Sequence, residues 1–179
     1  MMRLFIAVSI SNEVKEEMIN KIPLIRNQYK NGKWVPAENW HVTLLFLGEV
    51  SNDKISLVRS AMEESVRGIQ PFQLWVEGIG AFPNDINPKI LWAGVKGEME
   101  TLNILYQKLL QAVDKRGLPY DAKPRYKPHI TLSRKIEKRT DYQEIPLQTS
   151  EWTVQSLELY ESVSEYGGVT YKKIFTQNF

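Results

Sequence analysis

Two short segments of the sequence combine residues that can carry out acid–base chemistry near neutral pH. The chain of 179 residues has two histidines, and each begins the same pattern: His41-Val42-Thr43-Leu44 and His129-Ile130-Thr131-Leu132. In a β-strand, residues i and i+2 point to the same face, so each histidine shares a face with its threonine while the apolar residues point into the core. Imidazole has an unperturbed pKa of about 6.5 and exchanges protons near pH 7. The pattern therefore predicts two imidazole–hydroxyl pairs.

Hydrolysis of a cyclic phosphodiester is a reaction that suits two such pairs facing one cleft. One neutral imidazole can take a proton from the attacking water, while the other, protonated, donates to the departing ribose oxygen. The hydroxyls can hold the non-bridging oxygens. We therefore expect His41 and His129 to be catalytic and Thr43 and Thr131 to bind substrate, with no metal and no cofactor. The spacing is symmetric and does not distinguish the acid from the base.

The composition excludes several other chemistries. The chain has no cysteine, which excludes a thiol nucleophile, a disulfide framework and a thiolate metal site, and favours a reducing cytoplasm. A zinc site is the main rival for the histidines, but two histidines in separate halves without a clear third ligand match no standard zinc geometry. No apolar run approaches the roughly 20 residues that span a bilayer. We expect a soluble cytoplasmic protein, monomeric by default, with a net charge of +2.

Basic residues are concentrated around the second motif. Residues 123–139 contain seven basic residues and one acidic residue, so the rest of the chain is net acidic. This segment suits a phosphate-binding cleft, and Arg134 is the candidate for a phosphate contact, whereas Lys135, Lys138 and Arg139 also fit a solvated surface. Tyr126 is the candidate for stacking on a base, with packing in the core as its alternative.

The order of predicted elements repeats along the chain. We expect strands at residues 4–10, 40–47, 72–79, 90–95, 128–133, 152–162 and 170–175. Helices are expected behind Ser11, at 55–66 and at 99–113. A loop is expected at 80–88 and a turn at Gly167-Gly168. Each half runs strand, helix, loop, and then a strand that begins with its histidine. The halves are offset by 88 residues at the histidines and by 87 at Leu4 and Leu91. This suggests two similar lobes within a single domain spanning residues 1–179; the alternative is coincidence between ordinary α+β stretches.

These motifs resemble the 2H phosphoesterase superfamily, and within it the bacterial and archaeal RNA 2′,3′-cyclic phosphodiesterases, historically called 2′-5′ RNA ligases. The likeness covers nearly the whole chain: residues 3–7, 40–48, 80–83, 91–92, 127–132 with Arg134, and 160–162. It implies an α+β fold of two pseudo-symmetric lobes, each an antiparallel sheet with helices packed outside, flanking a central cleft. It also implies opening of a 2′,3′-cyclic phosphate to a 2′-phosphate, with His41 as proton donor to the 3′ oxygen and His129 as proton acceptor from water.

Two other functions remain compatible with the sequence. The first is the reverse direction, 2′-5′ ligation of RNA halves, which microscopic reversibility allows in the same cleft, although bulk water favours hydrolysis. The second is a non-catalytic protein that binds RNA ends or nucleotides. A binder needs cations and stacking surfaces more than two titratable groups, so the paired motifs favour catalysis. The expected substrates are RNA ends or small cyclic nucleotides.

Overall fold

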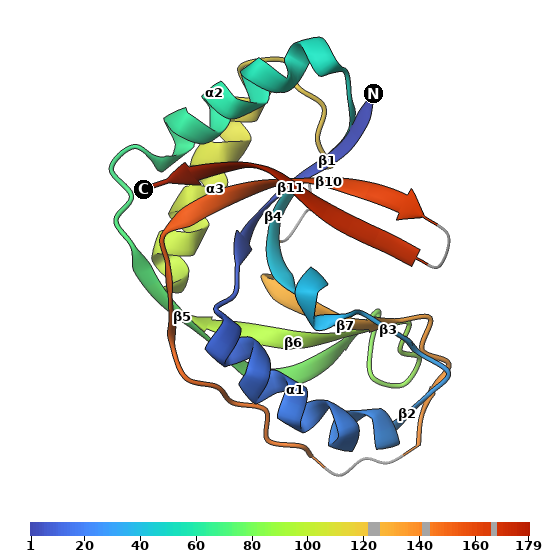
Figure 1. Ribbon diagram of the computed structural model, residues 1–179. Helices are drawn as coiled ribbons and strands as arrows, with labels where there is room; N and C mark the ends of the chain where they lie inside the picture. The colour runs from blue at the N-terminus through green and yellow to red at the C-terminus, as the bar shows by residue number, and fades with distance from the viewer. Residues whose placement is uncertain (122–125, 141–143, 166–167) are drawn as a thin grey trace.

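Two antiparallel sheets lie one above the other in Figure 1. They belong to a computed structural model that describes residues 1–121, 126–140, 144–165 and 168–179. The upper sheet has the order β11 (Gly168–Asn178), β10 (Ser156–Glu165), β1 (Met2–Ser9) and β4 (His41–Val50). The lower sheet has the order β3 (Lys33–Trp34), β7 (His129–Arg134), β6 (Ile90–Gly97), β5 (Phe72–Phe82) and β9 (Trp152–Val154). A short separate pair joins β2 (Tyr29–Lys30) to β8 (Lys138–Arg139).

The described chain has three α-helices, α1 (Asn12–Asn27), α2 (Ile55–Val66) and α3 (Met99–Asp114), and two 3₁₀ turns at Ala37–Asn39 and Asn52–Lys54. The first helix begins where expected, because the Ser11 hydroxyl accepts a hydrogen bond from the backbone N–H of Val14 at 3.3 Å. No helix among the described residues has the length and apolar character that crossing a membrane requires.

The helices cross from one sheet to the other. Helix α1 follows β1 of the upper sheet but lies along the lower sheet in Figure 1. There its Glu17 carboxylate accepts a hydrogen bond from the backbone N–H of Ser150, just before β9, at 2.9 Å. Helix α3 follows β6 of the lower sheet but contacts β4 of the upper sheet, and α2 contacts both α3 and β11. The predicted α+β fold, with two lobes of antiparallel sheet and helices outside them, is confirmed.

The two motif strands alternate between the core and the opposite face, as predicted. Val42, Leu44, Ile130 and Leu132 are all nearly inaccessible, with at most 4% of their surface exposed. They belong to one cluster of buried side chains that includes residues from both sheets. The histidines lie at the start of β4 and β7 and pair with Ser9 and Gly94 on the neighbouring strands. Core packing therefore fixes which face each histidine takes.

Two strands extend past the boundaries that their glycines suggested. Strand β4 continues through Gly48 to Val50, because Gly48 adopts a φ of 71° at an irregularity in the pairing with β1. Strand β5 reaches Phe82, so the expected loop at 80–88 is wrong for its first three residues. Gly80 pairs with Trp92, and a side chain on Gly80 would collide with the Trp92 ring. Both glycines permit a local geometry within a strand rather than ending it.

Gly94 offers a test of the packing behind the second motif. It pairs with His129, and a Cβ atom there would collide with the backbone carbonyl of Glu77. We expect Gly94→Ala to lower the free energy of unfolding by roughly 1–3 kcal/mol, measured by urea denaturation. Gly168→Ala is the control, since an added Cβ meets nothing within 4 Å, and should change stability by less than about 0.5 kcal/mol. Equal stability of the two variants would contradict this account.

Candidate active site

The first histidine is oriented by its own backbone. Nδ1 of His41 lies 2.7 Å from the carbonyl oxygen of Asn39, and Nε2 lies 2.9 Å from Oγ1 of Thr43. Because a carbonyl only accepts hydrogen bonds, Nδ1 must carry the hydrogen. In the neutral ring Nε2 is then the acceptor, and the Thr43 hydroxyl donates to it. The predicted pairing of imidazole and hydroxyl is present at β4.

The second histidine has the same anchor. Nδ1 of His129 lies 2.7 Å from the carbonyl oxygen of Lys127, again two residues earlier in the chain. This bond also assigns the hydrogen to Nδ1 and leaves Nε2 with its lone pair. The two rings therefore have the same tautomer and offer the same nitrogen to a ligand.

One cavity of about 280 Å³ brings the two motifs together. Both histidines, both threonines and Arg134 line it, so residues from β4 of the upper sheet and β7 of the lower sheet share one space. The sequence expected these five side chains at one site, and the structure places them there. Their roles stay a prediction.

Burial lowers the pKa of both imidazoles. The pKa of His41 falls from its ordinary value to about 4, chiefly because burial disfavours the charged ring, and the Asn39 carbonyl only partly opposes this. The positive charges of Arg134, His129 and Lys15 lower the pKa of His41 further. For His129 the pKa is also lowered, first by burial and then by Arg134 and Lys127. Both rings are therefore neutral at pH 7 when the cavity holds no anion.

Tyr126 does not lie in the cavity. Its ring stacks on Tyr106 with 4.1 Å between ring centres, and its hydroxyl donates to the backbone carbonyl of Thr43 at 3.2 Å. Burial raises the pKa of the Tyr126 phenol well above its ordinary value. The expectation that Tyr126 stacks on a base is therefore corrected: its ring packs behind β4, and its hydroxyl supports the backbone of the first motif.

Comparison with known proteins identifies the family. The RNA 2′,3′-cyclic phosphodiesterase of Thermotoga maritima is 32% identical over 99% of this chain and 96% of its own length. The protein of the same name from Archaeoglobus fulgidus is 33% identical over 97% of this chain and 98% of its own. The profile described as LigT like Phosphoesterase matches residues 8–92, which include His41 and Thr43. The chain belongs to the LigT-like phosphoesterase family. The resemblance drawn from the motifs is confirmed.

Solved structures of LigT-like phosphoesterases share this fold over the full chain. The protein TT0787 of Thermus thermophilus superposes with a TM-score of 0.83 at 28% identity and covers 99% of this chain and 97% of its own. Escherichia coli LigT, solved in complex with 3′-AMP, superposes with a TM-score of 0.81 at 25% identity over 99% and 97% of the two chains. The similarity therefore extends through both lobes, including the second motif that lies outside the profile match.

Aromatic rings surround the two histidines of this LigT-like cavity, and the sequence did not single them out. Tyr171 approaches the His41 ring edge-on at 5.1 Å between ring centres, and the buried Phe5 ring lies 4.8 Å from the His41 ring, also between centres. Phe82 meets the His129 ring edge-on at 5.1 Å. Phe5 and Phe82 lie within the family-like segments 3–7 and 80–83, which were usable signals. Tyr171 had none, because the pairing of β10 with β11 brings it to the cavity.

The basic segment contributes unevenly to the site. Arg134 lines the cavity, whereas the Lys127 ammonium lies 4.1 Å from the centre of the Trp92 ring. Lys135 and Lys138 are exposed and line none of the main cavities of the described chain. Lys123 and Arg125 lie outside the described residues. Of the cations of this segment that the structure describes, Arg134 is the one that lines the cavity with both histidines.

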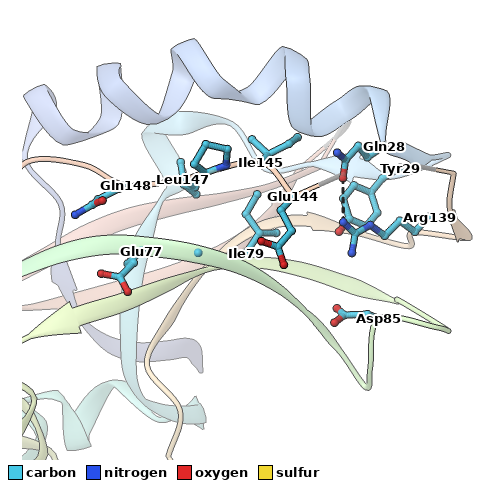
Figure 2. Close-up of a pocket in the computed structure, with 12 residues that line it drawn as sticks. Gln28, Tyr29, Glu77, Ile79, Asp85, Arg139, Glu144, Ile145, Leu147 and Gln148 are labelled. Atoms are coloured by element: carbon cyan, nitrogen blue, oxygen red, sulfur yellow. Dashed lines mark hydrogen bonds between the residues drawn. The ribbon is translucent and has the colours of Figure 1, made fainter. Parts of the chain in front are cut away.

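A second cavity, shown in Figure 2, is larger but unsuited to a phosphate. It has a volume of about 660 Å³ and lies between the end of α1, strand β5 and residues 144–148. Its lining includes the carboxylates of Glu77, Asp85 and Glu144, which repel an anion. Arg139, the cation at this cavity, donates a hydrogen bond to Oε1 of Gln28 at 3.2 Å. The smaller cavity therefore remains the candidate active site.

Metal binding has no ready cluster in the described ranges. Within them, no group of three or more histidine or acidic side chains is arranged to hold a metal ion. Metal-independent catalysis stays a prediction.

Titration of the two histidines by NMR tests this electrostatic description. We expect both rings to titrate below pH 6.5, His41 near pH 4, and both to carry the Nδ1 hydrogen when neutral. Arg134→Gln removes a nearby positive charge and should raise both pKa values. Lys138→Gln, an exposed residue outside the cavity, is the control and should change neither. Rings that titrate near their ordinary value would refute the burial argument.

Proposed function

We propose that this LigT-like phosphoesterase hydrolyses 2′,3′-cyclic phosphates at RNA ends or on small nucleotides to 2′-phosphates. The observation that carries the proposal is the convergence of two histidine–threonine pairs, from opposite sheets, on one cavity with both imidazoles in the same tautomer. The relatives named RNA 2′,3′-cyclic phosphodiesterase and the binding of 3′-AMP by Escherichia coli LigT support it. We infer that residues 1–179 act as one domain, monomeric and cytoplasmic.

The reaction needs two proton transfers at opposite sides of the phosphorus. His129 takes a proton from water at Nε2 while the water oxygen forms a bond to phosphorus. The bond between phosphorus and the 3′ oxygen breaks, and protonated His41 donates its Nε2 proton to that oxygen. The 2′ ester bond stays intact, so the product is a 2′-phosphomonoester with a free 3′ hydroxyl. These transfers balance without a metal ion or cofactor.

The threonines and Arg134 stabilise the phosphate. In the free protein the Thr43 hydroxyl lies 2.9 Å from Nε2 of His41. When a phosphate enters, this hydroxyl turns to a non-bridging oxygen and frees Nε2 for the 3′ oxygen. Thr131, which lines the same cavity from β7, offers its hydroxyl to another non-bridging oxygen. The Arg134 guanidinium lies on the same cavity and offsets the negative charge that grows on the phosphoryl oxygens.

Substrate binding also supplies the protonation state that the acid requires. Free His41 is neutral above about pH 4, chiefly because it is buried and partly because Arg134 disfavours a further positive charge. A bound phosphodiester anion neutralises that repulsion and raises the pKa of His41. The proton then enters with, or after, the substrate. The assignment of His41 as acid and His129 as base follows the family resemblance.

Product analysis by phosphorus NMR tests the reaction itself. We expect protein treated with EDTA to convert RNA ending in a 2′,3′-cyclic phosphate to the 2′-phosphate. His41→Ala and His129→Ala should each lower kcat by about 10²- to 10⁴-fold, because each removes one proton transfer, with circular dichroism confirming that both variants fold. Binding without turnover would indicate the non-catalytic alternative, and a 2′-5′ linked product from two RNA fragments would indicate ligation.

The pH dependence of kcat/KM tests the roles of the histidines. Catalysis needs one ring protonated and the other neutral, so kcat/KM should be bell-shaped. Since both pKa values are lowered in the free protein, the maximum should lie below pH 6.5. The maximum of kcat should lie at higher pH, because the bound anion raises the pKa of His41. A kcat/KM that rises steadily with pH would exclude the acid–base pair.

A further inference from the structure

The catalytic cavity continues into a second, larger groove. This groove has a volume of about 670 Å³ and shares Phe46, Arg134 and Tyr171 with the catalytic cavity. Among the main cavities of the described chain, it is the one that shares lining residues with the histidine site. A ligand bound at the histidines that extends beyond the small cavity can therefore continue along this groove.

One wall of the groove is a single face of the hairpin formed by β10 and β11. Ser162 pairs with Tyr171 and Ser164 pairs with Val169, and all four side chains line the groove. Residues two apart on a strand share a face, so this set is one continuous surface. The backbone carbonyl of Val169 also accepts a hydrogen bond from Nδ2 of Asn39, at 3.2 Å, and Asn39 lines the catalytic cavity. The hairpin formed by β10 and β11 thus contributes to the walls of both the catalytic cavity and the groove.

The groove combines cationic and aromatic groups. Arg3 and Arg134 line it, against the single carboxylate of Asp121. Arg3 is exposed, and no ion pair or hydrogen bond engages its guanidinium within the described residues. Tyr120 also lines the groove, and its hydroxyl donates a hydrogen bond to the Asp114 carboxylate at 3.2 Å. Cations along a groove with aromatic faces are the elements that bind single-stranded nucleic acid.

Strand β4 contributes Phe46 and Gly48 to the lining of the groove, and Phe46 also lines the catalytic cavity. A Cβ atom on Gly48 would meet nothing within 4 Å. Beside it, Phe46 is 42% exposed, although most large apolar side chains of these strands are buried. An uncovered ring at the junction of the two spaces offers a face on which a base can stack.

We propose that this groove binds the single-stranded RNA that precedes the terminal nucleotide. The inference rests on the proposed function, because it takes the cyclic phosphate to lie between His41 and His129. Arg3 contacts a backbone phosphate, the serines of the hairpin offer hydroxyls to the sugar–phosphate chain, and Phe46 and Tyr120 offer stacking faces. The preferred substrate is then an oligoribonucleotide end rather than a free cyclic mononucleotide, and affinity grows with the length of the RNA.

Two substrates that share the same cyclic phosphate separate the groove from the catalytic site. We compare kcat/KM for adenosine 2′,3′-cyclic phosphate and for a tetraribonucleotide ending in that group. Arg3→Ala should lower the value for the tetranucleotide about five- to tenfold and leave the mononucleotide within about twofold, because it removes one phosphate contact. Arg3→Lys should retain most of the preference. Lys30→Ala, an exposed cation on β2 of the other lobe, is the control and should change neither.

A pair of substitutions on the hairpin tests the face that lines the groove. Ser164→Glu places a negative charge on that face and should weaken the tetranucleotide selectively. Thr170→Glu adds the same charge to an exposed position on the opposite face of β11 and should not. Fluorescence anisotropy with a labelled tetranucleotide ending in a 2′-phosphate measures binding directly. The slope of log K against log salt should fall by about 0.7 for Arg3→Ala.

The outcomes distinguish the two proposals. A wild-type protein that opens neither substrate overturns the proposed function, and the groove assignment with it. A wild-type protein that opens both with equal kcat/KM, or an Arg3→Ala variant that slows both equally, overturns the groove assignment alone. Equal effects of Ser164→Glu and Thr170→Glu would also overturn it.

Discussion

Each histidine of the cavity is held by one hydrogen bond, from imidazole Nδ1 to the carbonyl two residues earlier in the chain. This bond sets both the tautomer and the direction of the ring. It has the same geometry at both sites because the chain enters the two strands in the same way. The carbonyls of Asn39 and Lys127 lie immediately before β4 and β7, so the chemistry depends on where those two strands begin. Burial of the neighbouring apolar residues then prevents either strand from shifting by one residue, which would turn the imidazole into the core.

Burial stabilises the site's geometry but disfavours its charged form. The same packing that orients His41 lowers its pKa to about 4, and Arg134 lowers it further. A cavity that disfavours positive charge on its rings while it presents a guanidinium favours an anionic ligand, since the anion offsets the positive charge of Arg134. The packing that positions the His41 ring thus also lowers its proton affinity, and the negative charge of a bound substrate restores that affinity.

The sequence predicted the parts of this site that depend on local geometry. The alternation of His41 and Thr43 with buried neighbours follows from the two-residue period of a strand, and its repetition at His129 indicated a shared cavity. Residues brought in by distant pairing had no such signal, and Tyr171 reaches the cavity only because β10 pairs with β11. Tyr126 lies before β7 begins at His129, outside the strand period that placed the threonines, and its ring stacks on Tyr106 of α3. Two glycines were wrongly interpreted as strand ends. Gly48 permits a bulge and Gly80 permits a close contact with the Trp92 ring, both inside strands.

The crossing of the helices has a consequence for the mechanics of the protein. Helix α1 covers the sheet that holds the second histidine, and α3 packs against the strand that holds the first. Each of these helices is thus joined by the chain to one sheet and packed against the other. The two helices therefore connect the two sheets that form the walls of the cavity, on the outside of the molecule. A motion that widened the cavity would require these helices to slide against the sheets that they cover. The fold therefore favours a cavity that is already formed before the substrate binds.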